Sequence, residues 1–230
     1  IFPPRITELR TLIEENYVDD LKGTLDRCEA VEQYAYEVDS DELRAYCQFY
    51  KGLTCYLHAQ LDRGYDLLVR CIEPLCQTEQ WELAGRAYNA LGNVASFQGE
   101  HSLAVDYFFV GLRFCKEHHL TTQTYRIINN IADMYISLGE YELAVEQLKI
   151  CAEGIASNPK ANAIIFGNLA YCYIHLGQLD EAEQHMNQVI SCHQDDMFDR
   201  CSILFLQASF YHSKGDLARC NEIIETLRAT

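Results

Sequence analysis

The chain has 230 residues and a formal net charge of −16. This acidity disfavours direct binding to nucleic acid or to anionic lipid, because such binding relies on Lys and Arg side chains that neutralise phosphates. No apolar run is long enough to cross a bilayer, so membrane insertion is not expected. The eleven cysteines are scattered rather than clustered, which predicts free thiols in a reducing cytoplasm.

The first half of the chain shows the start and stop signals of successive helices. Pro3-Pro4 opens a helix, because proline is tolerated at a helix start, and Asp39-Ser40 supplies an N-cap. Pro74 lies near a helix end, and Gly99 allows the left-handed turn that ends a helix. Together these signals predict six helices. The first begins near residue 5, the second and third are at 19–36 and 41–60, the fourth follows the third and ends near residue 76, and the last two are at 79–97 and 100–118.

The second half continues in the same way, with Gly139 as a turn between two helices. One loop-like connector interrupts it at 157–159. No convincing strand pattern is present. The predicted helices of this half are at 121–138, 141–156, 161–176, 179–192, 197–214 and 217–229.

Landmark residues return about every forty positions, which is a period typical of stacked repeats. Each copy contains a large residue followed by a small one, a turn glycine seven positions after the small residue, and a large apolar residue after the turn. The copies include Leu91-Gly92 with Gly99 and Phe108, Ile131-Ala132 with Gly139 and Leu148, Leu169-Ala170 with Gly177 and Met186, and Gln207-Ala208 with Gly215 and Ile224.

At these spacings the landmarks resemble the tetratricopeptide repeat (TPR) family. The resemblance implies an all-α fold, a right-handed superhelical solenoid of about six helix pairs and about twelve antiparallel helices, with a concave inner face. We expect a single solenoid over 1–230, with a divergent first pair. The predicted divisions are 1–38, 40–78, 79–119, 121–157, 159–193 and 196–229.

The sequence of one repeat, YRIINNIA at 125–132 followed by LGEYE at 138–142, is similar to the repeats of two groups of bacterial proteins. One is the N-terminal sensor repeats that precede diguanylate cyclase (GGDEF) domains, and the other is the quorum-peptide receptors. The resemblance implies a cytoplasmic sensory or docking region. Because the chain starts at Ile1 rather than Met and stops after a complete helix pair, we expect it to be a piece of a longer protein.

Residues at i, i+3 and i+7 share a helix face, which selects the side chains that face the groove. An Asn amide both donates to and accepts from a peptide backbone, and an Arg side chain holds a carboxylate with two hydrogen bonds. We therefore predict a groove that binds an extended peptide or protein segment, or a free C-terminus. The predicted ligand-binding residues are Arg86, Asn89, Asn93, Arg126, Asn129, Asn130, Asp133, Tyr171 and His175.

The same pattern is similar to the carboxylate clamp of chaperone-binding TPR domains, since Asn93 and Asn130 match its Asn positions. Its basic positions hold Asn89, Ile164 and Asn168 instead, so a receptor for chaperone tails is not expected. An alternative is that the polar residues solvate the inner face or bond to neighbouring helices. Aromatic and apolar residues of the groove either form side-chain pockets or pack between helices, namely Tyr46, Phe49, Leu53, Tyr56, Ile164, Tyr171, His175, Phe205 and His212.

No motif predicts catalysis, a cofactor or a metal. A glycine-rich phosphate loop, G-x-S-x-G and H-E-x-x-H are all absent from the sequence. Cys115, His118 and His119 come nearest to a metal cluster, but a structural zinc site needs four ligands. Two classes of function stay open: a peptide-binding module, or a scaffold that oligomerises, for example as a homodimer, through exposed aromatics such as Tyr107 and Phe109.

Overall fold

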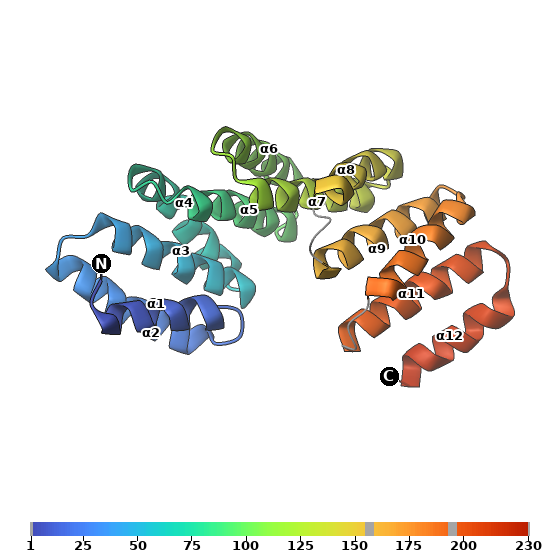
Figure 1. Cartoon of the computed structure of the whole chain (residues 1–230), viewed down its shortest axis with the longest axis horizontal. Helices are drawn as coiled ribbons and strands as arrows, with labels where there is room; N and C mark the ends of the chain where they lie inside the picture. Colours follow the sequence, from blue (N-terminus) through green and yellow to red (C-terminus); the bar gives the residue numbers. More distant parts are fainter. Residues whose placement is uncertain (1, 155–158, 193–196, 230) are drawn as a thin grey trace. The chain divides into compact units, whose positions relative to one another are not determined.

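The structure, a computed structural model, describes residues 2–154, 159–192 and 197–229. These residues form twelve α-helices in consecutive antiparallel pairs and contain no strand (Figure 1). The all-α fold of about six helix pairs is thereby confirmed. The predicted connector lies, at residues 157 and 158, outside the described part of the chain. None of the described helices combines the length and apolarity needed to cross a membrane.

Contacts divide the chain into two compact units, Ile1–Ile127 and Ile128–Thr230. The border falls within helix α7 (Thr121–Leu138). The helices that precede α7 are α1 (Pro4–Asn16), α2 (Leu21–Glu37), α3 (Asp41–Leu57), α4 (Leu61–Gln77), α5 (Trp81–Phe97) and α6 (His101–Glu117). Those that follow it are α8 (Tyr141–Gly154), α9 (Pro159–His175), α10 (Leu179–Cys192), α11 (Met197–Ser213) and α12 (Leu217–Ala229).

The turns from α2 to α8 recur every twenty residues. At each of them one residue takes a positive φ, and the amide of the residue that follows it bonds back to a carbonyl five residues earlier, as from Gln60 to Cys55 at 2.9 Å. Glycine occupies two of these positions, and the sequence predicted both. In these turns the residues with positive φ are Asp39, Ala59, Glu79, Gly99, His119 and Gly139, and Gly177 and Gly215 take the same conformation in the second unit.

The first unit shows why the repeat carries small residues beside large ones. Phe108 of α6 is buried against α5, and a Cβ added to Gly92 would collide with the Phe108 ring. Leu91, next to this glycine, is fully buried. The landmarks Leu91-Gly92 and Phe108 are therefore the two sides of one helix contact.

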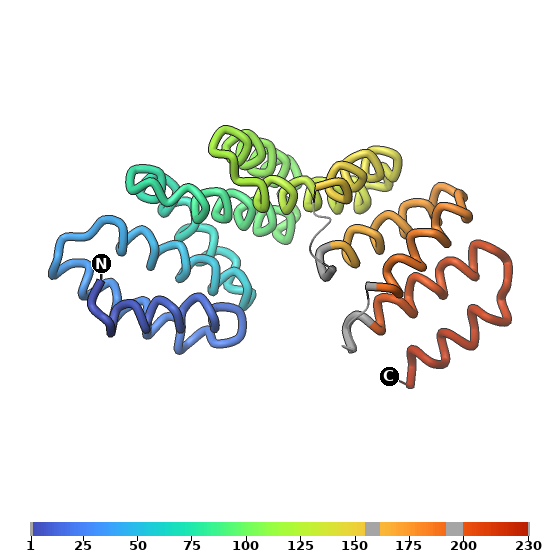
Figure 2. Tube along the Cα trace, in the orientation of Figure 1, coloured from blue at the N-terminus to red at the C-terminus, as the bar shows by residue number. Residues whose placement is uncertain are grey.

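The second unit stacks its helices in the same order, and Figure 2 follows α9 to α12 as antiparallel neighbours. Helix α9 contacts α8 and α10, and it also contacts α11 directly. In the first unit α3 contacts α5 in the same way. The first helices of successive pairs therefore line one side of each unit, which we call its inner face. We call the second helix of each pair an outer helix.

Candidate functional site

On the inner face of the first unit, Arg86 is surrounded by aromatic rings. Its guanidinium carbon lies 5.0 Å from the centre of the Phe49 ring, 5.5 Å from that of Tyr50 and 5.6 Å from that of Tyr17. Its Nη1 donates a hydrogen bond to the Tyr50 hydroxyl at 3.2 Å. The predicted ligand-binding residue Arg86 is half-buried, and its side chain joins α5 to the aromatic residues of α3.

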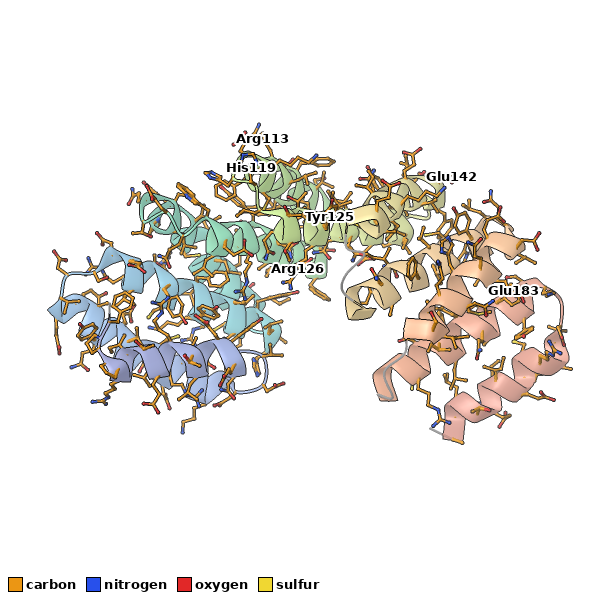
Figure 3. The ribbon with its side chains drawn as sticks, in the orientation of Figure 1. Arg113, His119, Tyr125, Arg126, Glu142 and Glu183 are labelled. Carbon is orange, nitrogen blue, oxygen red and sulfur yellow. The ribbon has the colours of Figure 1, made fainter. Side chains whose placement is uncertain are left out.

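The other predicted residues near this face differ in exposure. Asn93 is half-buried and hydrogen-bonds to Tyr56, which opposes the rise that burial causes in the pKa of that tyrosine. Asn89 is half-buried and has an interaction partner. Arg126 is exposed on α7, and Figure 3 labels it beside Tyr125. In this unit Arg86 and Asn93 thus bond to a neighbouring helix, as the alternative interpretation of these polar residues proposes.

In the second unit, Asp133 of α7 lies between two amide side chains. The Nδ2 of Asn168, on α9, donates to Oδ1 of Asp133 at 2.7 Å. The Nδ2 of Asn129, one turn earlier on α7, donates to Oδ2 at 3.3 Å. No ion pair among the described residues involves Asp133. The result is an anionic group that is held in place by amides and has no cationic partner there.

The surroundings of Asp133 change its acidity. Its side chain is exposed by surface area, yet burial of the carboxylate between helices raises its pKa to about 6, against the opposing hydrogen bond from Asn168. The thiols of Cys151 on α8 and Cys172 on α9 are fully buried nearby, and burial first and then the Asp133 charge raise the pKa of each to about 12. Asp133 therefore faces neutral groups on both helices.

Further along α9, aromatic rings form a shelf that we define as Tyr141, Tyr171, His175 and Phe205. His175 stacks on Tyr141 with ring centres 4.6 Å apart and planes 11° from parallel. Tyr171 lies 4.5 Å from His175 and is nearly parallel to Phe205 at 6.4 Å. His175 is exposed, and Phe205 is 54% exposed. Two predicted residues, Tyr171 and His175, thus lie in ring contact one turn apart on α9, with their planes tilted by 54°.

A cleft of about 370 Å³ adjoins this shelf within the second unit, at the lower end of the usual range for ligand pockets. Its walls come from α9, α11 and α12 and are mainly apolar. They include Ile174, His175, Phe205, Ala208, Ile224 and Leu227.

The two units differ in what their inner-face aromatic and apolar residues do. Tyr46, Phe49 and Leu53 of the first unit are buried, so they pack between helices. Ile164 and Phe205 of the second unit are each 54% exposed. The accessible aromatic and apolar residues of the predicted groove therefore belong to α9 and α11.

Sequence reasoning left three contributing residues out of the predicted site. Tyr141 begins an outer helix and was not assigned to the groove, although its ring stacks on His175. Tyr17 and Tyr50 surround Arg86 from α1–α2 and α3, far from it in sequence. Asn130 of α7, which the sequence did predict, is half-buried and has an interaction partner. A search for aromatic residues about one repeat away from each polar inner-face residue would have found Tyr50.

The residues of the nearest metal-like cluster separate into different environments. Cys115 is buried, and His118 stacks on Trp81 with ring centres 4.1 Å apart. His119 is exposed at the left-handed turn after α6, where Figure 3 labels it. Among the described side chains, no three of the His, Cys, Asp and Glu residues gather closely enough to hold a metal ion.

Comparison with known families and structures supports the repeat fold. Residues 123–195 match the family model described as tetratricopeptide repeat. Comparison with curated proteins gave no match. The apo form of the quorum sensor NprR from B. thuringiensis is 17% identical, with a TM-score of 0.75 over 97% of this chain and 62% of that chain. This chain thus spans less than two thirds of the NprR chain.

Two further solved structures are similar. NprR in complex with its cognate peptide NprX is 16% identical, with a TM-score of 0.66 over 97% of this chain and 65% of that one. The nearly identical TPR-like repeats of a putative kinesin light chain from Podospora anserina are 19% identical, with a TM-score of 0.63 over 81% of this chain and 94% of that one. At such identities the likeness shows the fold alone, and it confirms a TPR-like solenoid.

Proposed function

We propose that the chain is a non-catalytic TPR module that binds a peptide or protein segment on its inner face. The observation that carries this proposal is the arrangement on α7 and α9, where the carboxylate of Asp133 is flanked by the amides of Asn129 and Asn168. Amides and carboxylates supply the acceptors and donors that a peptide backbone or side chain requires. The peptide-bound NprR structure supports the proposal as a protein of similar fold.

We further propose that the module is the sensory or docking region of a larger bacterial signalling protein, such as a diguanylate cyclase, and that its helix pairs form one array. The sequence of the repeat at 125–142 supports this proposal, because it resembles the sensor repeats that precede diguanylate cyclase domains. A cytoplasmic location is supported by the ten cysteines whose side chains the structure describes, all of which are free thiols. The likeness to NprR supports the related alternative of a quorum-peptide receptor.

Thermal unfolding in the presence of peptide pools tests the binding proposal, because a ligand of the folded state raises the melting temperature by mass action. The wild-type chain is compared with Asn168→Ala on the inner face and with Asn187→Ala on the exposed side of α10. We expect some pools to raise the melting temperature of wild type and Asn187→Ala, and to raise that of Asn168→Ala less. If no pool changes the wild-type melting temperature, the proposal is wrong.

A second candidate function is a scaffold that acts through self-association. On the outer helix α6, the neighbouring residues Phe109 and Val110 are 51% and 38% exposed. Tyr107 is less available for such a contact, since its hydroxyl is hydrogen-bonded to that of Tyr65 at 2.9 Å. Sedimentation of the wild type and of Phe109→Ser distinguishes the two functions, because a scaffold dimerising through this surface would dissociate in the variant.

A further inference from the structure

The central stretches of the inner helices in the second unit carry few charged residues. In the stretches 128–138, 162–174 and 201–211, which belong to α7, α9 and α11, Asp133 is the only side chain with a formal charge. Acidic residues lie instead on the outer helices, where Glu142 and Glu183 are exposed (Figure 3). Arg126 precedes this stretch of α7 by two residues, and Arg200 precedes that of α11 by one. Within the stretches themselves, Asp133 is the only group that can make a charged contact with a ligand.

The carboxylate of Asp133 retains capacity to bind a cation. A carboxylate offers about four lone-pair sites, and two of these accept the amides of Asn129 and Asn168. Those amides orient the carboxylate but do not neutralise it. A Lys or Arg side chain of a ligand would supply the missing positive charge, and the net charge of −16 favours its approach.

The apolar cleft lies about two helical turns along α9 from Asn168, which bonds to this carboxylate. Asn168, Tyr171 and His175 share one face of the helix, since they are spaced i, i+3 and i+7. Asn168 bonds to Asp133, whereas His175 lines the cleft. Seven helical residues span about 10 Å. An extended peptide covers this distance in about three residues.

We propose that the second unit recognises an extended peptide segment through two side chains about three residues apart: a basic one that pairs with Asp133, and a large apolar one that enters the cleft beside Phe205. The proposal rests on the proposed peptide-binding function and specifies its ligand. The amides of the inner face contribute to orientation, while the carboxylate and the cleft determine which peptides bind. The exposed ring of Phe205 supplies an aromatic surface for the apolar side chain.

An array of acetylated and amidated octapeptides provides the test, because blocked ends remove terminal charges. Lys and Phe stand three residues apart in the reference set, and matched sets replace Lys by Glu, replace Phe by Ala, or place Lys and Phe side by side. Dissociation constants are then measured by fluorescence polarisation for the peptides bound best. We expect the reference peptides to bind at least about tenfold more tightly than their Glu counterparts, which corresponds to about 1.4 kcal/mol.

Variants of the chain assign each preference to its residue. Asp133→Asn should reduce the preference for Lys over Glu to about twofold and keep the preference for Phe over Ala, in line with loss of one charge contact. Ala208→Trp, which fills the cleft, should reduce the preference for Phe over Ala and keep the preference for Lys over Glu. Ala208→Leu is made in parallel because its side chain fills less of the cleft. Glu183→Gln removes one charge from the outer helix α10 and should change neither preference.

The outcomes separate this inference from the proposed function. If the chain binds peptides without preferring Lys, or if Asp133→Asn keeps that preference, the inference is wrong while peptide binding stands. If neither the array nor the unbiased pools contain a bound peptide, the proposed function itself is wrong.

Discussion

At the scale of single residues, Arg86 contributes to stability rather than to an open binding surface. Its guanidinium contacts three aromatic rings and donates to the Tyr50 hydroxyl. A cation near aromatic rings is worth up to about 2 kcal/mol when shielded from water, and a hydrogen bond from a charged donor adds to this. We expect Arg86→Ala to lower the free energy of unfolding by about 2 kcal/mol, as measured by urea denaturation.

The matched control for this prediction is Arg126→Ala, because Arg126 is exposed on α7. An exposed substitution of this kind changes stability by about 0.5 kcal/mol or less. Tyr50→Phe removes only the hydroxyl and should cost about 1 kcal/mol. Equal stabilities of the Arg86→Ala and Arg126→Ala variants would show that the aromatic surroundings of Arg86 contribute nothing.

Asp133 gives the stability an unusual dependence on pH. Burial raises its pKa in the folded chain to about 6, above the ordinary value of 3.8. The folded state therefore holds the proton more tightly than the unfolded state, so this residue favours folding at low pH. That contribution is fully present below about pH 4 and is lost as the pH rises through about 6.

Replacement of Asp133 by Asn removes this dependence, since the amide does not titrate. We expect Asp133→Asn to melt at a higher temperature than wild type at pH 7.5 and the difference to shrink towards pH 4.5. The difference between the two proteins cancels the titration of the remaining carboxylates. Glu183→Gln is the charge-matched control. A difference between wild type and Asp133→Asn that stays constant from pH 4.5 to 7.5 would contradict the assigned pKa.

At the scale of the helices, the left-handed turns predict how the residue with positive φ affects the free energy of unfolding. Ala59 has a φ of 59° and Gly99 a φ of 80°, and nothing lies within 4 Å of a Cβ added at Gly99. A residue with a Cβ pays about 1 kcal/mol or more in this conformation, whereas glycine does not. We expect Ala59→Gly to stabilise the chain by about 1 kcal/mol and Gly99→Ala to destabilise it by about as much.

Chemical denaturation of both variants checks this reciprocal pair. Because no neighbouring atom interferes at Gly99, its substitution reports the backbone conformation alone. A loss of stability in both variants would mean that the flexibility of glycine in the unfolded chain outweighs the relief of strain at Ala59.

The helices and their order follow from local patterns, which is why the sequence predicts them. The capping Ser40, for example, accepts the predicted kind of hydrogen bond from the Leu43 amide at 3.3 Å. The turns at Ala59 and Glu79 carry no glycine, so composition alone does not reveal their left-handed backbone. The surroundings of Arg86 and Asp133 come from residues about 35 positions away, Tyr50 and Asn168. Spacing on one helix cannot predict such contacts, because they depend on how successive pairs stack.

At the scale of the whole molecule, the net charge of −16 opposes folding through self-repulsion. The attractive ion pairs of the described residues are few and mostly exposed, as in Arg228 with Glu225, and such pairs contribute about 1 kcal/mol or less each. We therefore expect repulsion among the many acidic side chains to outweigh local attraction, and both are screened by salt.

Stability and ligand binding should consequently respond to salt in opposite directions. Raising NaCl from 20 to 500 mM shortens the screening length and reduces self-repulsion, so the melting temperature should rise by about 2–4 °C for each kcal/mol gained. Over the same range, the affinity for a Lys-containing peptide at Asp133 should fall, because salt also screens attraction. Replacing Glu142 and Glu183 by Gln should weaken the salt dependence of the melting temperature. It should leave the salt dependence of peptide affinity nearly unchanged, since both residues lie on outer helices. A melting temperature that falls with salt would instead show that the ion pairs dominate the electrostatic energy of the fold.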